Sequence, residues 1–396
     1  MPQSIKRPLQ ILGAATLAMG LSGAAWADDF SWPRLMVIAT PGTSSGSFAS
    51  TNGWAPILQG DKGVTIRVVP EDSEAMRHRR LVERRDITIA SVSGAEMRSQ
   101  IEGTGAYAAI NPASQRILWH HNDTPWGFVV SGNSDIHTME DLKRGGIRVT
   151  NGIFSPTIVE TMTVGLPDYL GLTQEEAQEL FTYVPASSYA ESCRHVVEGR
   201  SDVTYCAPIS AVLSEMEGAP GGIRWLDMPA SNTEGWERLL ATRSMLVPSV
   251  ISMGVQSARG IEGATSNFVY AVPTDMEEEF AYNLAKWFHT AHDSYKGTHP
   301  LATRMSLEEF RNYLDNTPIP VHAGTVRYLR EIGAWTEADD AWNEAAIALM
   351  DAWGEARQAA LDEARANRVN IDFENPEFLE ILRAKTEGLE IFRSRL

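Results

Sequence analysis

Two glycine- and serine-rich turns carry the residues best suited to hold a small anion. The first turn is 41–47 (PGTSSGS), which follows the apolar run 35–40. The second is 151–157 (NGIFSPT), in which Ser155 stands as an N-cap before Pro156. Where a strand runs into a helix, several backbone N–H groups lack partners and the helix dipole favours negative charge. Each turn therefore predicts a seat for a carboxylate or phosphate, although an ordinary well-capped strand–helix turn has the same pattern.

Side chains in and beside these turns include hydroxyl, amide, guanidinium and aromatic groups that suit ligand contact. Hydroxyl and N–H groups donate to carboxylate oxygens, Arg pairs with a carboxylate through two parallel bonds, and flat rings stack on ligands. For the aromatic residues, packing in a core or at a hinge fits the pattern equally well, and Arg148 has a neighbouring acid as its alternative partner. The predicted ligand-binding residues are Thr43, Ser44, Ser45, Ser47, Phe48, Ser73, Trp126, Arg148, Asn151, Phe154, Ser155, Thr157 and Tyr205.

The sequence does not favour a metal, nucleotide or catalytic site. His120 and His121 precede Asp123, but adjacent residues of a strand point to opposite faces, so the two imidazoles do not share one ion. The turn 41–47 has neither the GK[ST] of a Walker loop nor a spaced glycine triplet. The residues 42–46 (GTSSG) have the GxSxG spacing, but no base is spaced to serve a serine nucleophile, and the chain has no HExxH motif. We therefore predict no cofactor, no metal and no enzymatic activity.

The alternation of strands and helices around the two turns predicts an α/β fold. β-type runs separated by helical segments indicate a parallel sheet with helices on both faces. The segment 232–263 has no assignable pattern. The predicted strands are 35–40, 64–69, 87–92, 117–121, 126–131, 147–150, 182–184, 202–206, 223–226 and 265–272. The predicted helices include 47–58, 74–84 with a solvated basic face at 78–80, 95–102, 157–170, 174–180, 189–198 and 275–295.

These elements predict two lobes, with mostly parallel sheets flanked by helices. Lobe 1 is discontinuous, at 28–125 and 265–335, and lobe 2 is 126–264. Strands that cross between the lobes leave a cleft, and ligands of such sheets bind beyond the carboxyl ends of the strands. Both Gly/Ser turns are expected there, one from each lobe. A helical extension at 336–396 is expected to pack across the back of a lobe or to mediate dimerisation.

The amino-terminal residues predict export. Lys6 and Arg7 precede an apolar run at 9–21 that is too short to span a bilayer, and Ala25-Trp26-Ala27 fits a cleavage site. We predict a signal peptide at 1–27 and a soluble periplasmic protein without a membrane anchor. Its removal takes two positive charges from the formal net charge of −17 and leaves −19. This sign argues against nucleic acid and anionic membranes as partners.

The two cysteines, Cys193 and Cys206, leave two alternatives open. Export permits a disulfide, and a predicted helix and strand that follow one another carry the two residues. The spacing does not fix the separation of the Cα atoms, so a bridge and two free thiols are equally compatible with the sequence.

Several motifs taken together resemble the TAXI family of extracytoplasmic solute receptors, the binding components of one class of TRAP transporters. The matching segments lie between 35 and 333, and the most specific is 319–325 (IPVHAGT) with Tyr328. The others are 40–48 (TPGTSSGSF), Ser73, 141–143 (DLK), 151–157, 199–203 (GRSDV) and 331–333 (EIG). The resemblance implies a type II-like two-lobe periplasmic binding fold that delivers an organic acid or amino acid to a sodium-coupled permease.

The chain departs from the family pattern at two places. It has Phe48-Ala49 where family members commonly carry a Tyr pair, and Ser93-Gly94 where a polar or acidic residue commonly follows the third strand. Both places border the expected pocket, so the ligand stays open among dicarboxylates, 2-oxo acids, amino acids and aromatic acids.

Two other classes of function remain beside the transport receptor. A ligand-sensing partner of a membrane kinase binds a solute in the same way but co-purifies with a sensor. A periplasmic hydrolase is the least favoured, because no nucleophile and base have a supporting spacing.

Overall fold

The computed structural model describes residues 30–112, 114–315, 317 and 319–392. The predicted signal peptide at 1–27 lies outside the described residues. Trp32–Leu396 form one compact unit, and this unit contains both lobes and the helical extension.

Lobe 1 is built around three parallel strands in the order β2-β1-β3. These are β1 (Leu35–Thr40), β2 (Thr65–Pro70) and β3 (Ile89–Ser93). The helices between and after them are α1 (Gly46–Lys62), α2 (Glu74–Arg79), which continues as the π-helix Arg80–Arg84, and α3 (Gly94–Glu102). The predicted βαβαβ order of this lobe is confirmed, and each helix begins at a serine cap because the cap accepts a first-turn N–H.

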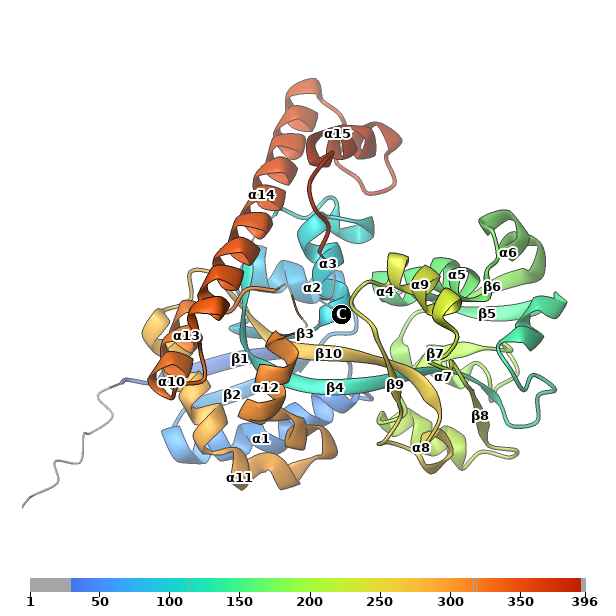
Figure 1. The fold of residues 1–396 in the computed structure, drawn as a ribbon, viewed down its shortest axis with the longest axis horizontal. Coiled ribbons are helices and arrows are strands. Elements are labelled where there is room, and N and C mark those ends of the chain that lie inside the picture. Colours follow the sequence, from blue (N-terminus) through green and yellow to red (C-terminus); the bar gives the residue numbers. More distant parts are fainter. Residues whose placement is uncertain (1–29, 113, 316, 318, 393–396) are drawn as a thin grey trace, which may run out of the picture. The chain divides into compact units, whose positions relative to one another are not determined.

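Two long strands, β4 (Gln115–Ser131) and β10 (Glu262–Pro273), run between the lobes as an antiparallel pair (Figure 1). The expected division of β4 into two strands is wrong. The segment 122–125 (NDTP) has the composition of a turn, but it stays in the ladder. Its polar side chains find tertiary partners, since Asn122 donates to Ser47 Oγ at 3.3 Å and Asp123 binds Arg304 at 2.7 Å.

The expectation of mostly parallel sheets also needs correction. Among the named strands, β2-β1-β3 in lobe 1 and β5-β6 in lobe 2 pair in parallel, whereas β10 is antiparallel to β3, β4 and β9, and β4 is antiparallel to β7 and β8. The chain passes from one lobe to the other along β4 and returns along β10, so these two neighbours have opposite directions. The result is a mixed sheet with flanking helices.

Lobe 2 contains the strands β5 (Ile147–Gly152), β6 (Phe181–Ala186), β7 (Thr204–Cys206), β8 (Ile223–Leu226) and β9 (Val247–Val250). Its helices are α4 (Pro156–Glu160), the π-helix Thr161–Gly165, α5 (Leu166–Leu170), α6 (Gln174–Leu180), α7 (Tyr189–Arg194), α8 (Ala211–Glu217) and α9 (Thr233–Thr242). The unassigned segment 232–263 therefore holds α9 and β9. The first three helical pieces follow one another without a break and match the single helix expected over 157–170.

The rest of the chain is helical. Lobe 1 is completed by α10 (Glu278–Thr290), α11 (His292–Tyr295), α12 (Leu307–Leu314) and α13 (Ala323–Glu331), and the extension consists of α14 (Glu337–Asn367) and α15 (Pro376–Thr386). Short 3-10 helices lie at Gly105–Tyr107, Glu140–Arg144, Gln256–Ala258, Lys296–Thr298 and Pro300–Met305. His322 accepts from the N–H of Gly324 and so caps α13. Within the described part of the chain, no helix combines the length and apolar character required to cross a membrane.

The extension packs on lobe 1 through a buried guanidinium. Arg357 of α14 is 2% exposed and donates to four backbone carbonyls at the end of α3 and in the following turn. These acceptors belong to Gln100 (2.7 Å), Ile101 (3.1 Å), Tyr107 (2.8 Å) and Ile110 (2.8 Å). Because a buried charge requires this many partners, α14 is held rigidly against lobe 1.

Candidate functional site

A cavity of about 70 Å³ lies between the lobes and receives side chains from both Gly/Ser turns. Ser45 and Ser47 reach it from the first turn, and Phe154 and Thr157 reach it from the second. This is the juxtaposition that the two turns predicted. The amino ends of α1 and α3 also face the cavity, since Gly46 and Ala95 are among its lining residues. Their first-turn N–H groups add to the positive potential of the lobe 1 wall.

Six of the predicted ligand-binding residues line this cavity, and seven do not. The lining residues are Ser45, Ser47, Trp126, Phe154, Thr157 and Tyr205. The residues outside the lining are Thr43, Ser44, Phe48, Ser73, Arg148, Asn151 and Ser155.

Residues outside the lining have structural contacts of other kinds. Arg148 forms a two-pronged pair with Asp202, in which Nη2 lies 2.7 Å from Oδ1 and Nε 3.1 Å from Oδ2. Ser155 is fully buried and accepts from the N–H of Ile158, and Ser73 caps α2 in the same way. The carbonyl of Ser44 accepts from the N–H of Ala211 in lobe 2 at 3.2 Å. Arg148 thus has the neighbouring acid that was its alternative partner.

Five charged residues that the sequence analysis did not select line the cavity: Asp72 before α2, Glu74 and Arg77 on α2, Glu96 on α3, and Arg243 after α9. Arg77 is 1% exposed and donates from Nη2 to both carboxylate oxygens of Glu96 at 3.2 Å. Glu74 and Arg77 are three residues apart and share the inward face of α2, so helical periodicity could have found them. The expectation that 78–80 is a solvated face is wrong at His78, which is 2% exposed.

The carboxyl groups of Glu74 and Glu96 lie together on the lobe 1 wall. Burial raises the pKa of Glu96 well above its usual value, and the neighbouring charge of Glu74 raises it further, against the opposing effect of Arg77. Burial beside another carboxyl group therefore favours the neutral form of Glu96. Thr157 of lobe 2 donates to Glu74, at 2.9 Å from Oε2 and 3.2 Å from Oε1. The cavity is therefore closed by a direct contact between the lobes.

The lobe 2 wall presents aromatic rings and a second guanidinium. The ring of Trp126 stacks on that of Tyr205, with centroids 5.2 Å apart and an angle of 13° between their planes. Arg243 is 5% exposed and binds Glu160 through Nη1 at 2.7 Å. Burial raises the pKa of Tyr205, while the positive charge of Arg243 opposes that rise, so the hydroxyl remains a hydrogen-bond donor.

Several buried donors of the lining have no acceptor among the described residues. They are Trp126 Nε1, Tyr205 Oη, Arg243 Nε and Arg77 Nε. Buried polar groups in folded proteins are nearly always hydrogen-bonded, and leaving one unpaired costs about 1–3 kcal/mol. A ligand rich in acceptor oxygens fits this wall, because it satisfies several donors at once.

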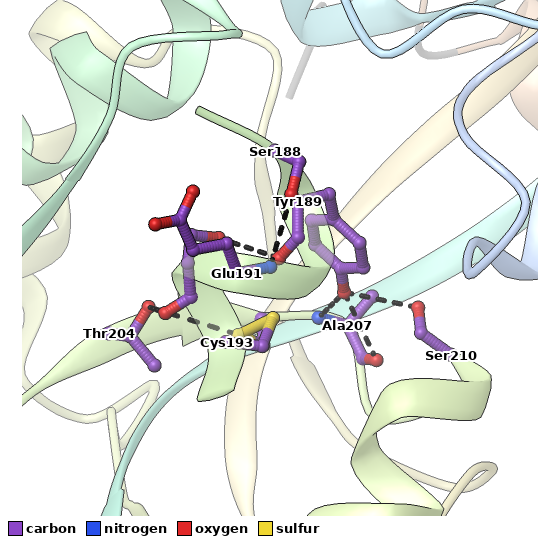
Figure 2. Close-up of a disulfide and its surroundings, with 9 residues drawn as sticks. Ser188, Tyr189, Glu191, Cys193, Thr204, Ala207 and Ser210 are labelled. Atoms are coloured by element: carbon purple, nitrogen blue, oxygen red, sulfur yellow. Dashed lines mark hydrogen bonds between the residues drawn. A yellow bond between two sulfur atoms is a disulfide. The ribbon is translucent and has the colours of Figure 1, made fainter. Parts of the chain in front are cut away.

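A disulfide between Cys193 and Cys206 holds the aromatic part of the site (Figure 2). It joins α7 to the end of β7, with 6.1 Å between the Cα atoms. Of the two alternatives that the sequence left open, the structure has the bridge. Tyr189 on α7 accepts from the N–H of Ala207 at 2.8 Å and lies 3.0 Å from Ser210 Oγ. The bridge therefore fixes Tyr189 relative to Tyr205, the residue before Cys206.

The histidines of β4 are used inside the protein core. His120 Nε2 lies 3.0 Å from Asp123 Oδ1, and His121 Nδ1 lies 2.9 Å from Ser91 Oγ. Burial lowers the pKa of His121 well below its usual value, so its ring is neutral. Over the described ranges, no three His, Cys, Asp or Glu side chains gather in a way that suits a metal ion.

Comparison with solved structures returns distant likenesses. The binding-protein component of an ABC phosphonate transporter from Pseudomonas aeruginosa is 10% identical with a TM-score of 0.42, covering 85% of this chain and 99% of that one. The periplasmic VFT2 domain of Bordetella pertussis BvgS is 12% identical with a TM-score of 0.40, covering 69% and 93%. An ancestral arginine-binding protein bound to arginine is 14% identical with a TM-score of 0.40, covering 67% and 96%. These scores give no information on a ligand of this chain.

Comparison with family models gives a clearer result. No curated protein matches the sequence. One family model matches residues 38–333, a range that includes both lobes, the two crossing strands and every residue named in the cavity. The chain belongs to the NMT1-like family.

Proposed function

We propose that this protein is a periplasmic solute receptor that binds a small organic acid in the cavity between its lobes and delivers it to a TRAP-type membrane permease. The observation that carries the proposal is the set of buried donors on Trp126, Tyr205, Arg243 and Arg77 that have no acceptor among the described residues. A carboxylate offers two acceptor oxygens and a negative charge to the two guanidinium groups.

The two walls of the cavity suit different ends of such a ligand. On the lobe 2 side, Arg243, Trp126 and Tyr205 offer donors, which suit a carboxylate. On the lobe 1 side, the Glu74–Glu96 pair offers acceptors, and Arg77 compensates part of its charge. An acid that also carries an amino or hydroxyl group satisfies both walls, whereas a second carboxylate meets repulsion from Glu74. Amino acids and hydroxy acids therefore rank above dicarboxylates.

Binding is proposed to proceed by closure of the lobes about the crossing strands. With the lobes apart, the solute reaches the Trp126 wall on lobe 2. Closure brings Thr157 to Glu74 and the amino end of α1 to the solute, and it removes water from the buried charges. Electrostatic contacts strengthen as water leaves, so the closed state binds more tightly than the open one.

The proposed delivery to a permease and the proposed periplasmic location are inferred from the sequence. The resemblance to TAXI receptors covers 35–333, and the segment 1–27 has the pattern of an export signal. A sodium-coupled permease in the inner membrane is the partner that such a receptor serves.

Calorimetric titration with amino acids, hydroxy acids, 2-oxo acids, dicarboxylates and aromatic acids tests the binding step. We expect saturable one-to-one binding of at least one acid by the mature protein, and its loss in Arg243→Gln. Uptake of that acid by cells that express the receptor with its candidate permease tests delivery. Binding without sodium-dependent uptake would contradict the transport role and favour the ligand-sensing alternative.

A further inference from the structure

The end of the helical extension reaches both lobes beside the ligand cavity. Leu389–Phe392, called the C-terminal tail below, follows α15 and runs back to the junction of α3 with lobe 2 (Figure 1). The matched family region ends at residue 333, so the tail lies outside it.

Phe392 of the tail forms one hydrogen bond to each lobe. Its N–H donates to Glu102 Oε1 at the end of α3 at 2.8 Å, and its carbonyl accepts from Ser244 Oγ of lobe 2 at 3.1 Å. The side chain of Phe392 is fully buried. Within the tail, the carbonyl of Glu390 accepts from Trp353 Nε1 of α14 at 2.8 Å. Arg357 fixes α14 to lobe 1, and Trp353 of α14 binds the tail. The tail is therefore attached to lobe 1 and contacts lobe 2 through Ser244.

The same junction contains a second bond between the lobes. Arg98 of α3 donates to Glu102 Oε2 at 3.0 Å, to the carbonyl of Thr242 at 3.3 Å and to Ser244 Oγ at 3.2 Å. The hydroxyl of Ser244 thus accepts from Arg98 and donates to Phe392. Both carboxyl oxygens of Glu102 accept a hydrogen bond in this network, Oε1 from Phe392 and Oε2 from Arg98. An ionised carboxylate accepts both bonds, whereas a neutral carboxyl group accepts them only when its own proton points away.

The lobe 2 segment that contacts the tail includes a residue of the ligand cavity. Ser244 follows Arg243, and Arg243 and Leu246 both line the ligand cavity. A smaller space of about 30 Å³ at the junction is lined by Arg98, Ser244 and Arg243, so the two spaces share Arg243. Displacement of Ser244 away from lobe 1 therefore moves Arg243 with it.

We propose that the C-terminal tail is a latch that holds the Arg243 segment of lobe 2 against lobe 1, so that the cavity opens only when Phe392 separates from Ser244. The latch acts on lobe closure itself and does not depend on which solute is bound. It gives the extension a role in the exchange of ligand: the tail raises the population of the closed state and slows the opening step that release requires.

The test is made on the mature protein without added solute, so that its failure is separate from a failure of the proposed ligand class. Hydrogen exchange is measured by mass spectrometry for peptides covering 242–246 and 154–158, and the radius of gyration is measured by small-angle X-ray scattering. Three variants are compared with the full chain: one that ends at Gly388, Ser244→Ala, and both changes together. Ser214→Ala, an exposed serine on α8 of the same lobe, is the matched control.

We expect the variant that ends at Gly388 to exchange roughly three- to tenfold faster at 242–246 and 154–158, with a larger radius of gyration, as one lost interlobe bond predicts. Ser244→Ala is expected to have at least as large an effect, since it also breaks the bond from Arg98 to Ser244 Oγ. Its effect must shrink when the tail is already absent, because both changes break the bond between Ser244 and Phe392. Ser214→Ala is expected to match the full chain. Unchanged exchange and radius in the truncated variant, or full additivity of the two changes, would overturn the latch. If truncation unfolds the protein, Ser244→Ala alone decides by the same readouts.

Discussion

The hydroxyl of Thr157 lies 2.9 Å from Glu74 Oε2, and this bond joins lobe 2 to lobe 1 at the wall of the cavity. Thr157 comes from the turn that begins α4, and Glu74 begins α2. Glu74 also faces Glu96, whose raised pKa reflects burial and the charge of Glu74. The Thr157 hydroxyl of lobe 2 therefore gives Glu74 a hydrogen-bond donor. Closure of the lobes forms this bond, and the bond in turn stabilises the closed state.

Substitution of Thr157 tests this contact. Thr157→Val removes the donor and keeps the shape of the side chain, so Glu74 loses a buried partner in the closed state only. We expect affinity for a bound acid to fall roughly tenfold, mostly through faster dissociation, measured by stopped-flow fluorescence. Thr163→Val is the control, since its hydroxyl bonds to the carbonyl of Val159 inside lobe 2. Equal dissociation rates in wild type and Thr157→Val would remove this bond from the closing step.

Arg243 and Arg148 are the two alternatives for the guanidinium that binds the ligand, and they give a direct comparison. Arg243 lines the cavity, whereas Arg148 is paired with Asp202 outside it. Arg243→Gln is expected to weaken binding of the acid by about a hundredfold or more, because a charge-assisted bond to a buried anion is lost. Arg148→Gln is expected to leave the dissociation constant unchanged. Calorimetric titration of both variants makes the measurement, and the reverse order of effects would restore Arg148 as the anion partner.

The raised pKa of Glu96 gives a stability effect that depends on pH. The pKa of Glu96 is raised in the folded protein above its ordinary 4.5, so the unfolded chain loses this proton at lower pH than the folded one. The stabilisation is complete below about pH 4.5 and is lost as pH rises through the folded pKa. Urea unfolding from pH 4.5 to 8 is expected to show a smaller decline in Glu96→Gln than in wild type. Glu380→Gln, at an exposed position of α15, should keep the wild-type slope, and an equal slope in Glu96→Gln would contradict the raised pKa of Glu96.

Loss of the disulfide is expected to destabilise lobe 2 and loosen the aromatic wall. The bridge closes a loop with a sequence separation of 13, for which chain entropy predicts a contribution of about 3 kcal/mol to the free energy of unfolding. The double variant Cys193→Ala with Cys206→Ala is expected to lose about that much in urea unfolding. A reducing agent should lower the stability of wild type and leave the double variant unchanged. A double variant as stable as oxidised wild type would show that the bridge does not hold this region.

The sequence predicted the parts of the fold that depend on local pattern. The strand Leu35–Thr40 and the Ser155-Pro156 start of α4 follow from apolar character and cap chemistry, and the structure has both. The joined β4 was missed because Asn122 and its polar neighbours resemble a turn until their distant partners, Ser47 and Arg304, are known. Direction of pairing was missed for the same reason, because it depends on how the chain returns from the second lobe.

The candidate site was predictable where it sits on a motif and not where it depends on the fold. Ser45 and Thr157 follow from the Gly/Ser turns. Arg77 could be found only through its three-residue spacing from Glu74 on the inward face of α2, and Arg243 lies in a segment with no periodic pattern. Glu96 lies two residues beyond Ser93-Gly94 and lines the cavity, although no motif marks it in the sequence.

The most direct test of the binding claim is a thermal-shift screen of the mature protein against organic acids, with sugars and polyamines as controls. A ligand that binds only the folded state at a hundred times its dissociation constant adds about 2.7 kcal/mol, which raises Tm by several degrees in a protein of this size. We predict that at least one amino acid or hydroxy acid gives this shift and that Arg243→Gln abolishes it. A protein that no acid stabilises, or that a sugar or polyamine stabilises instead, would contradict an acid-binding cavity between the lobes.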